Sequence, residues 1–277
     1  MVTTDKLRDA VLRQINEIVE MVEATIPANP NSVDNEKLAR QTEEFLAAYF
    51  VAIELAFPYQ SLSALYNKHV PVKESGPVGE TNDILEPILK TFRAKLLLDL
   101  MGQHVSAYLK GSAEMIFWGT TKGGIPIAFE GPPIRQAIDY ARQHCAQLVT
   151  KMDEESKQRI AQIIADGIEN KRGIPGLARD LRAEFKDMSR NRSQMIARTE
   201  TADALEQGFM DRADAMGVTG KEVVTGDPCE ICASFGDEGV VKIDHEYVFK
   251  GESYGERPPF HPRCSCALAP VMLPTKE

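Results

Sequence analysis

Apolar side chains recur at three- and four-residue steps through the first two-thirds of the chain, the spacing that places them on one face of a helix. One such stripe covers residues 7–26, and a second covers residues 38–57, where Pro58 ends it. The composition of residues 71–80 is that of a loop. A long apolar helix is expected after it, over residues 84–109.

The helical pattern is interrupted by residues 119–133, which are rich in glycine and proline and predict a short hairpin or a flexible loop. Helical spacing returns over residues 134–148. The sequence Thr150-x-x-Asp153 then has the form of a capping box, which predicts the start of another helix with its apolar stripe over residues 160–168.

Two further helices are expected before the pattern changes. Gly173 is predicted to end the preceding helix, and Pro175 suits the first turn of the next, whose apolar residues fall within 177–185. A last long helix is predicted over residues 189–216, with Gly217 as the residue that follows its end.

Beyond residue 217 the helical pattern gives way to short β-type runs at 223–224, 240–243 and 247–249, separated by glycine, aspartate and proline. The predicted fold is therefore mainly α, a helical bundle-like part followed by a small C-terminal β-rich Cys/His module, and α+β overall. Its predicted parts are a helical N-terminal region (1–130), a second helical part (131–218) and the module (219–277).

Four of the five cysteines lie close together near the C-terminus, as Cys229-x-x-Cys232 and then His261-x-x-Cys264-x-Cys266. A C-x-x-C turn places two thiolates on one side of a loop, and Zn²⁺ takes four tetrahedral nitrogen or sulfur ligands. In an extended strand the last two cysteines would point to the same face and act as a pair. Five candidates compete for four places, and the sequence does not choose among them.

The spacing favours a structural zinc ion, about one per chain, over a redox dithiol, disulfides or free thiols. A lone C-x-x-C also fits a redox dithiol, but no βαβ pattern surrounds this one and a second cluster follows it. A site closed by four protein ligands has no open position for water, so we expect no enzyme activity. Cys145 stands apart and is expected to be a small buried hydrophobic residue.

The net charge of −9 argues against a protein that coats nucleic acid over its whole surface. The charge is uneven, since residues 171–198 hold eight bases against three acids, and residues 1–60 are acidic enough to suit a protein dock. A charge run is usually a solvated helix face. Contact with nucleic acid or with an acidic protein surface is the second interpretation. The residues predicted for that contact are Arg179, Arg182, Lys186, Arg190 and Arg192.

Several motifs occur in a familiar order. Residues 196–201 read IARTET on a predicted helix, residues 215–218 read AMGV, the C-x-x-C follows Asp-Pro, and residues 258–266 read PPFHPRCSC. Over roughly residues 130–270 this order and spacing resembles the phage head morphogenesis family, the minor head proteins typified by protein F of phage Mu. That family usually has a basic residue between its last two cysteines, where this chain has Ser265.

The resemblance implies a low-copy structural protein in the head interior, at the portal vertex of a tailed bacteriophage virion, made in the host cytoplasm. Such a protein would bind the portal protein, with capsid or scaffold proteins and viral DNA as further partners during head assembly and DNA packaging or ejection. No membrane contact is expected, because the chain has no run of about 18 apolar residues. Arg198 and Glu200 do not face each other on a helix. We therefore expect each to pair with a residue of another element, in a buried ion pair that ties the helix to the Cys/His module.

Two other functions are compatible with the residues. A zinc-dependent hydrolase or nuclease would use His245 or His261 beside an open metal position. A helix-turn-helix DNA-binding protein would place the helices of residues 160–168 and 177–185 around the Gly-Ile-Pro turn, with basic residues on one face of the second helix.

Overall fold

The computed structural model describes residues 33–69, 78–121, 125, 131–225 and 228–274. The helix predicted over residues 7–26 and parts of the loops predicted at 71–80 and 119–133 lie outside these residues. The chain forms two compact units, each built from separate segments. The helical unit comprises Glu43–Leu100 and Gln143–Gln194, and the module unit comprises Met1–Thr42, Met101–Arg142 and Met195–Glu277.

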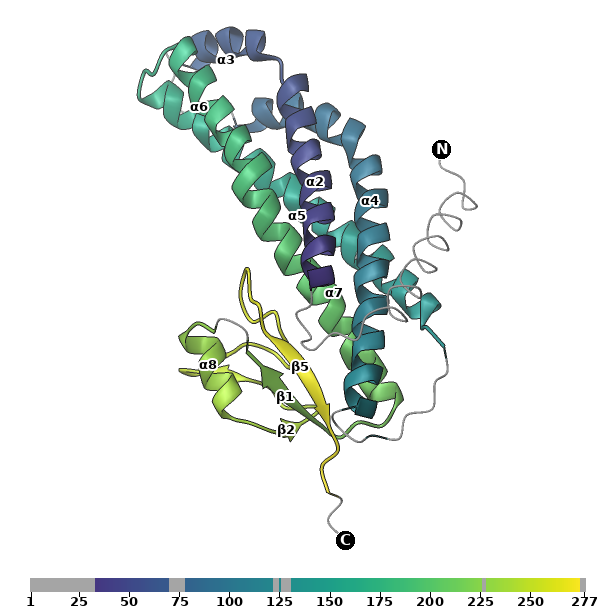
Figure 1. Ribbon diagram of the computed structural model, residues 1–277. Coiled ribbons are helices and arrows are strands. Elements are labelled where there is room, and N and C mark those ends of the chain that lie inside the picture. The colour runs from purple at the N-terminus through teal and green to yellow at the C-terminus, as the bar shows by residue number, and fades with distance from the viewer. Residues whose placement is uncertain (1–32, 70–77, 122–124, 126–130, 226–227, 275–277) are drawn as a thin grey trace. The chain divides into compact units, whose positions relative to one another are not determined.

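Long helices make up most of the chain and confirm the predicted, mainly α fold (Figure 1). Each of the four longest contributes residues to both units. These four are α2 (Val33–Ala56), α4 (Val78–Thr121), α5 (Ile134–Glu169) and α7 (Ser193–Ala215). The shorter elements among them are the 3₁₀ turn η1 (Tyr59–Ser61), α3 (Leu62–His69), α6 (Ile174–Asp187) and the π turn η2 (Met188–Arg192).

The capping box predicted at Thr150 is wrong, because α5 passes through that position without a break. The Thr150 hydroxyl donates to the carbonyl of Ala146, one turn back in the same helix, at 2.9 Å. Asp153 is buried and used elsewhere. A capping box and a continuous helix share the same local sequence, so only tertiary packing decides between them.

Residues around the turn between α5 and α6 confirm the predicted boundary. Gly173 has φ 73°, a left-handed conformation that favours glycine, and Pro175 stands in the first turn of α6. The two helices run antiparallel: Arg159 of α5 pairs with Glu184 of α6, whereas nearer the turn an added Cβ on Gly167 would meet Leu177. This is an αα-hairpin.

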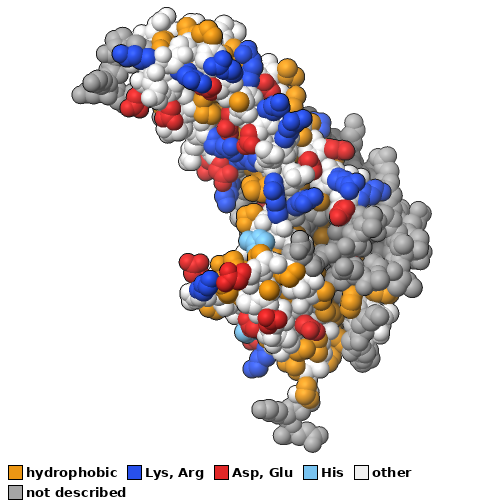
Figure 2. Space-filling view, turned by 60° about the vertical axis from the view of Figure 1, so that its left-hand side comes forward, with side chains coloured by type: hydrophobic (Ala, Val, Ile, Leu, Met, Phe, Trp, Pro, Cys, Tyr) orange, Lys and Arg blue, Asp and Glu red, His pale blue; other side chains and the backbone are white. Residues whose placement is uncertain are grey.

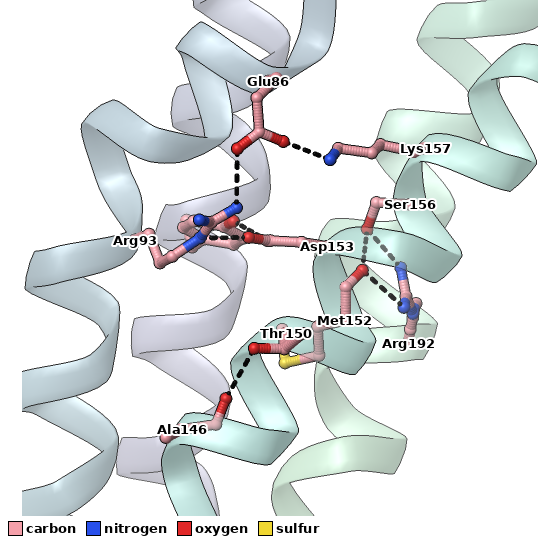
Figure 3. A network of polar contacts seen from close by, with 10 residues as sticks. Glu86, Arg93, Ala146, Thr150, Met152, Asp153, Ser156, Lys157 and Arg192 are labelled. Atoms are coloured by element: carbon pink, nitrogen blue, oxygen red, sulfur yellow. Dashed lines mark hydrogen bonds and ion pairs between the residues drawn. The ribbon is translucent and has the colours of Figure 1, made fainter. Parts of the chain in front are cut away.

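A polar network around the buried carboxylate of Asp153 joins the helices of the helical unit (Figure 3). Asp153 of α5 is 2% exposed, accepts a hydrogen bond from the Tyr49 hydroxyl of α2, and pairs with Arg93 Nε of α4 at 2.6 Å. Arg93 also reaches Glu86, which binds Lys157 of α5. Because a buried carboxylate must be paired and hydrogen-bonded, these partners are what allow Asp153 to lie inside the unit.

In the module unit, two glycines let α4 and α7 touch backbone to backbone. A Cβ added to Gly208 would lie 1.9 Å from the Tyr108 carbonyl oxygen, and one added to Gly111 would lie 1.8 Å from that of Leu205. No side chain larger than hydrogen fits at either position. The crossing places the end of α7, followed by Gly217 at φ 68°, next to the chain segment that forms the module.

The C-terminal module is β-rich, as predicted, but it contains more regular structure than the sequence indicates. Its sheet has the antiparallel order β2-β1-β5, made of β1 (Gly220–Val224), β2 (Val241–Lys242) and β5 (Ala267–Val271). A hairpin of β3 (Val248–Phe249) and β4 (Glu252–Ser253) and the helix α8 (Glu230–Asp237) complete it. The short β-type runs found in the sequence correspond to β1, β2 and β3.

Aromatic rings fill the core of the module. The ring of Phe235 lies 4.7 Å from that of Phe260 and 5.1 Å from that of Tyr247, measured between centroids. Phe209 of α7 and Met115 of α4 belong to the same buried cluster. The module therefore packs directly on the ends of two helices of its own unit.

None of the described helices is by itself both long and apolar enough to cross a membrane. Glu36–Ala56 and Tyr59–His69 pass that test only as a pair bent by 51°.

Candidate metal centre

The first two candidate ligands stand at the start of α8. Cys229 is its N-cap residue, and Cys232 lies in its first turn with 1% exposure. Backbone N–H groups at a helix N-terminus are free to stabilise a thiolate. The N–H of Cys232, helped by the neighbouring thiol and by the N–H of Ile231, accordingly lowers the pKa of Cys229.

The other three candidates lie in the turn that leads into β5. The N–H of Cys264 donates to the His261 carbonyl at 3.1 Å, and Arg263 between them has φ 62°. Strand β5 begins at Ala267, one residue after Cys266. The turn brings both sulfurs within 4.8 Å of the Cys232 sulfur and of each other.

The ligand atoms converge at distances that suit one metal ion. His261 Nε2 lies 3.3 Å from Cys229 Sγ and 3.2 Å from Cys232 Sγ, and Cys232 Sγ lies 3.7 Å from Cys264 Sγ. Tetrahedral zinc bonded to sulfur at about 2.3 Å and to nitrogen at about 2.0 Å would separate two sulfurs by about 3.8 Å and a sulfur from a nitrogen by about 3.5 Å. Cys232 is common to both groups of three, Cys229–Cys232–His261 and Cys232–Cys264–Cys266.

The tautomer of His261 follows from its other ring nitrogen. Nδ1 lies 2.9 Å from the Pro262 carbonyl, which can only accept, so Nδ1 carries the proton. In the neutral ring the Nε2 lone pair then faces the two sulfurs of α8. This is the arrangement found at metal-bound histidines, where a carbonyl fixes the ring and leaves the second nitrogen to the metal.

The thiols hold their protons unequally. Hydrogen bonding from the Cys266 thiol, together with nearby backbone N–H groups, lowers the pKa of Cys264 to about 5. Burial, reinforced by the Cys264 thiolate, raises the pKa of Cys232 to about 12, and the hydrogen bond to that thiolate raises the pKa of Cys266. A cation that binds beside the Cys264 thiolate would therefore displace protons from the neighbouring thiols.

The five residues predicted from the sequence are thus close enough to bind a metal. The donor set is sulfur and imidazole with no carboxylate, which suits a soft or borderline cation rather than Mg²⁺ or Ca²⁺. His245 is separate from it. That ring pairs with Glu238 at 2.8 Å and belongs to none of the ligand groups formed by the described residues.

The structure divides the predicted basic contact residues into two kinds. Arg192 is 4% exposed, binds Ser156 and Glu155 at 2.8 and 2.9 Å, and lies over the Phe50 ring. It therefore joins the helices of the helical unit. The other four are exposed, and they are Arg179, Arg182, Lys186 and Arg190.

The buried ion pair expected at Arg198 is wrong. Arg198 is exposed and belongs to none of the ion pairs found in the described part of the chain. Glu200 lies 3.5 Å from His104 of α4. The contact between this stretch of α7 and the ligand turn is a hydrogen bond instead, from the Arg263 N–H to the Thr199 hydroxyl at 3.2 Å.

Arg257 forms the ionic contact between the module and α7, a role that no sequence pattern indicates. Its guanidinium binds the Asp203 carboxylate and the Gln207 amide oxygen, each at 2.8 Å. Asp203 also accepts from the Tyr140 hydroxyl at 2.7 Å. A lone arginine ahead of two prolines has no spacing that would reveal its partners.

Comparisons with family models, with curated proteins and with solved structures find no match to this chain.

Proposed function

We propose that this chain is a minor head protein of a tailed bacteriophage, with a C-terminal module stabilised by one structural zinc ion. The observation that carries the proposal is that four cysteine sulfurs and one histidine nitrogen come together where the start of α8 meets the turn before β5. The phage role rests on the resemblance of residues 130–270 to the head morphogenesis family.

Zinc is the metal that suits the donor set best. Thiolate and imidazole ligands select zinc in cytoplasmic proteins, and four protein ligands close the coordination sphere. The fifth candidate then acts as a neighbour that hydrogen-bonds a ligand. With a closed site the metal supplies folding energy and no catalysis, so we propose a structural protein rather than an enzyme.

The contact between α7 and the ligand turn supports the resemblance. The two motifs that carry it, residues 196–201 and 258–266, are about sixty positions apart in the sequence. They meet through the hydrogen bond between Thr199 and Arg263. The two motifs that carry the resemblance are therefore parts of one joined structural unit in this chain.

The proposed location is the head interior at the portal vertex, after synthesis in the host cytoplasm. The proposed partners are the portal protein, capsid or scaffold proteins, and viral DNA during packaging or ejection.

The antiparallel hairpin of α5 and α6 argues against a helix-turn-helix DNA-binding protein, whose two helices cross at a steep angle.

Quantitative mass spectrometry of purified particles and proheads of the phage that encodes this chain tests the proposal. We expect a few copies per particle, in constant ratio to the portal protein. Absence from both particles and proheads would contradict a head role. A variant with Cys232→Ser should reach the particle at lower copy number, because its module would not fold.

A further inference from the structure

One face of α6 and the adjoining π turn carries four exposed cations at steps of three, four and four residues, and we call it the basic stripe. It consists of Arg179, Arg182, Lys186 and Arg190. At 100° and 1.5 Å per residue the three positions in α6 fall within an arc of about 60° and extend over roughly 10 Å, and Arg190 follows them in the π turn. Figure 2 brings forward the side of Figure 1 on which α6 lies, and shows Lys and Arg side chains along the helical part, interspersed with acidic ones.

The acidic residues of the same segment are neutralised from elsewhere. Glu184 and Asp187 pair with Arg159 of α5 at 2.6 and 3.0 Å, and Asp180 pairs with Arg172 at 2.7 Å. Within the described part of the chain, no member of the basic stripe forms an ion pair. The α6 surface therefore keeps its positive charges available while its negative charges are bound.

The stripe has no apolar component that would favour a protein partner. Exposed large hydrophobic side chains occur on other elements of the described chain, and none lies on α6. Protein interfaces bury an apolar centre, whereas phosphate contacts need only cations and hydrogen-bond donors. Three of the four side chains are arginines, whose planar fork suits phosphate oxygens. The guanidinium of Arg182 is held over the Tyr59 ring at 4.4 Å.

We propose that the basic stripe binds the phosphate backbone of duplex DNA without reading its sequence. Each strand of B-DNA carries a phosphate about every 3.4 Å along the helix axis, so the four cations of the stripe have several phosphates within reach. The inference extends the proposed role in a DNA-filled head, but it is tested on the purified protein and does not depend on the virion result. Arg159 acts as a positioning residue, because it keeps Glu184 and Asp187 away from the DNA.

Fluorescence anisotropy of the full chain with a labelled duplex of about 30 base pairs, at several salt concentrations, tests the proposal. The logarithm of the binding constant should fall with the logarithm of salt at a slope of about −3 to −4, as expected for four phosphate contacts. The double variant Arg179→Ala/Lys186→Ala should bind about tenfold more weakly and reduce that slope by about 2. The matched control Arg135→Ala/Lys151→Ala removes two exposed cations elsewhere and should leave binding within about twofold.

A second variant leaves the stripe itself intact. Arg159→Ala would release Glu184 and Asp187 beside it and should weaken DNA binding several-fold, and adding Glu184→Gln and Asp187→Asn should restore it. Equal binding by the stripe variant and its control would overturn the proposal. An absence of DNA binding at low salt would also overturn it. Binding of poly-glutamate in place of DNA would assign the stripe to an acidic protein partner. None of these outcomes would change the zinc content or the virion copy number of the chain.

Discussion

The helical unit and the Cys/His module build their buried interiors in different ways. In the helical unit, long helices bury continuous apolar faces, and the charged side chains that lie inside, such as Asp153 and Arg192, are satisfied by named partners. The module has strands of two to five residues and one eight-residue helix, and its buried cluster includes three cysteine side chains.

This difference indicates where each region obtains its stability. Side-chain burial along long helices stabilises the helical unit without any added group. In the module the segments at 229–232 and 261–266 are about thirty residues apart, and the polar side-chain contacts that join them run between the candidate ligands themselves. Bonds from one metal ion to these ligands would join the two segments firmly. Hydrogen bonds among the protonated ligands join them only weakly.

The largest expected effect is that of metal removal. Chelation should unfold the module and leave the helical unit folded, because structural zinc supplies binding energy on the order of 10 kcal/mol. Hydrogen exchange followed by mass spectrometry would show protection lost in peptides from residues 218–273 and kept in peptides from α5. Equal protection of the module with and without chelator would show that the module does not depend on a metal for its stability.

The next effect concerns the crossing of α4 and α7. Gly208→Ala should destabilise the protein by about 3 kcal/mol or more, because its Cβ would lie 1.9 Å from the Tyr108 carbonyl oxygen and must push the helices apart. Gly79→Ala is the control, since nothing lies within 4 Å of a Cβ at this exposed helical position. Thermal unfolding should show a lower Tm for the first variant and an unchanged or slightly higher Tm for the second.

A smaller effect is expected in the polar network of the helical unit. Asp153→Asn should cost about 2–3 kcal/mol, because it removes the charge that Arg93 and the Tyr49 hydroxyl bind inside the unit. Asp99→Asn breaks a pair with Lys95, whose side chain is 78% exposed, and should cost less than about 0.5 kcal/mol. Urea unfolding of both variants would measure the difference, and equal costs would show that burial of Asp153 adds nothing.

The last expected effect is a pH dependence within the module. Lys221 is fully buried and donates to the carbonyls of Ile243 and His245, and burial lowers its pKa to about 8. Between that pH and about 10.5 the unfolded chain binds the proton and the folded chain does not, so stability should rise with pH in this window, by at most about 3 kcal/mol. Denaturation of the zinc-loaded protein should show the rise, and Lys221→Met should remove it. A rise of the same size in the variant would assign it to another group.

The sequence predicts most of the helices correctly because their apolar stripes are long and periodic. It fails where tertiary contacts choose between local conformations. Thr150 bonds backward within α5 although its sequence resembles a cap. The π turn that joins α6 to α7 turns Arg192 inward, and no local pattern distinguishes that arginine from its exposed neighbours.

The candidate ligands are all identified by spacing, since cysteine and histidine clusters are rare enough to stand out. Spacing does not reveal the elements that position these ligands. The helix α8 that orders Cys229 and Cys232 is short, and the salt bridge of Arg257 to Asp203 joins residues more than fifty positions apart. Contacts of that range depend on the fold and have no signal in a single sequence.

The structural zinc site is tested most directly by the metal content of the full chain, purified without added metal or chelator and measured by inductively coupled plasma mass spectrometry. We expect about one zinc per chain. Zinc should be lost in Cys232→Ser, whose sulfur is shared by both ligand groups, and retained in Cys145→Ser, whose buried thiol lies outside them. A metal-free protein whose module is nevertheless fully protected from hydrogen exchange would contradict the structural zinc site.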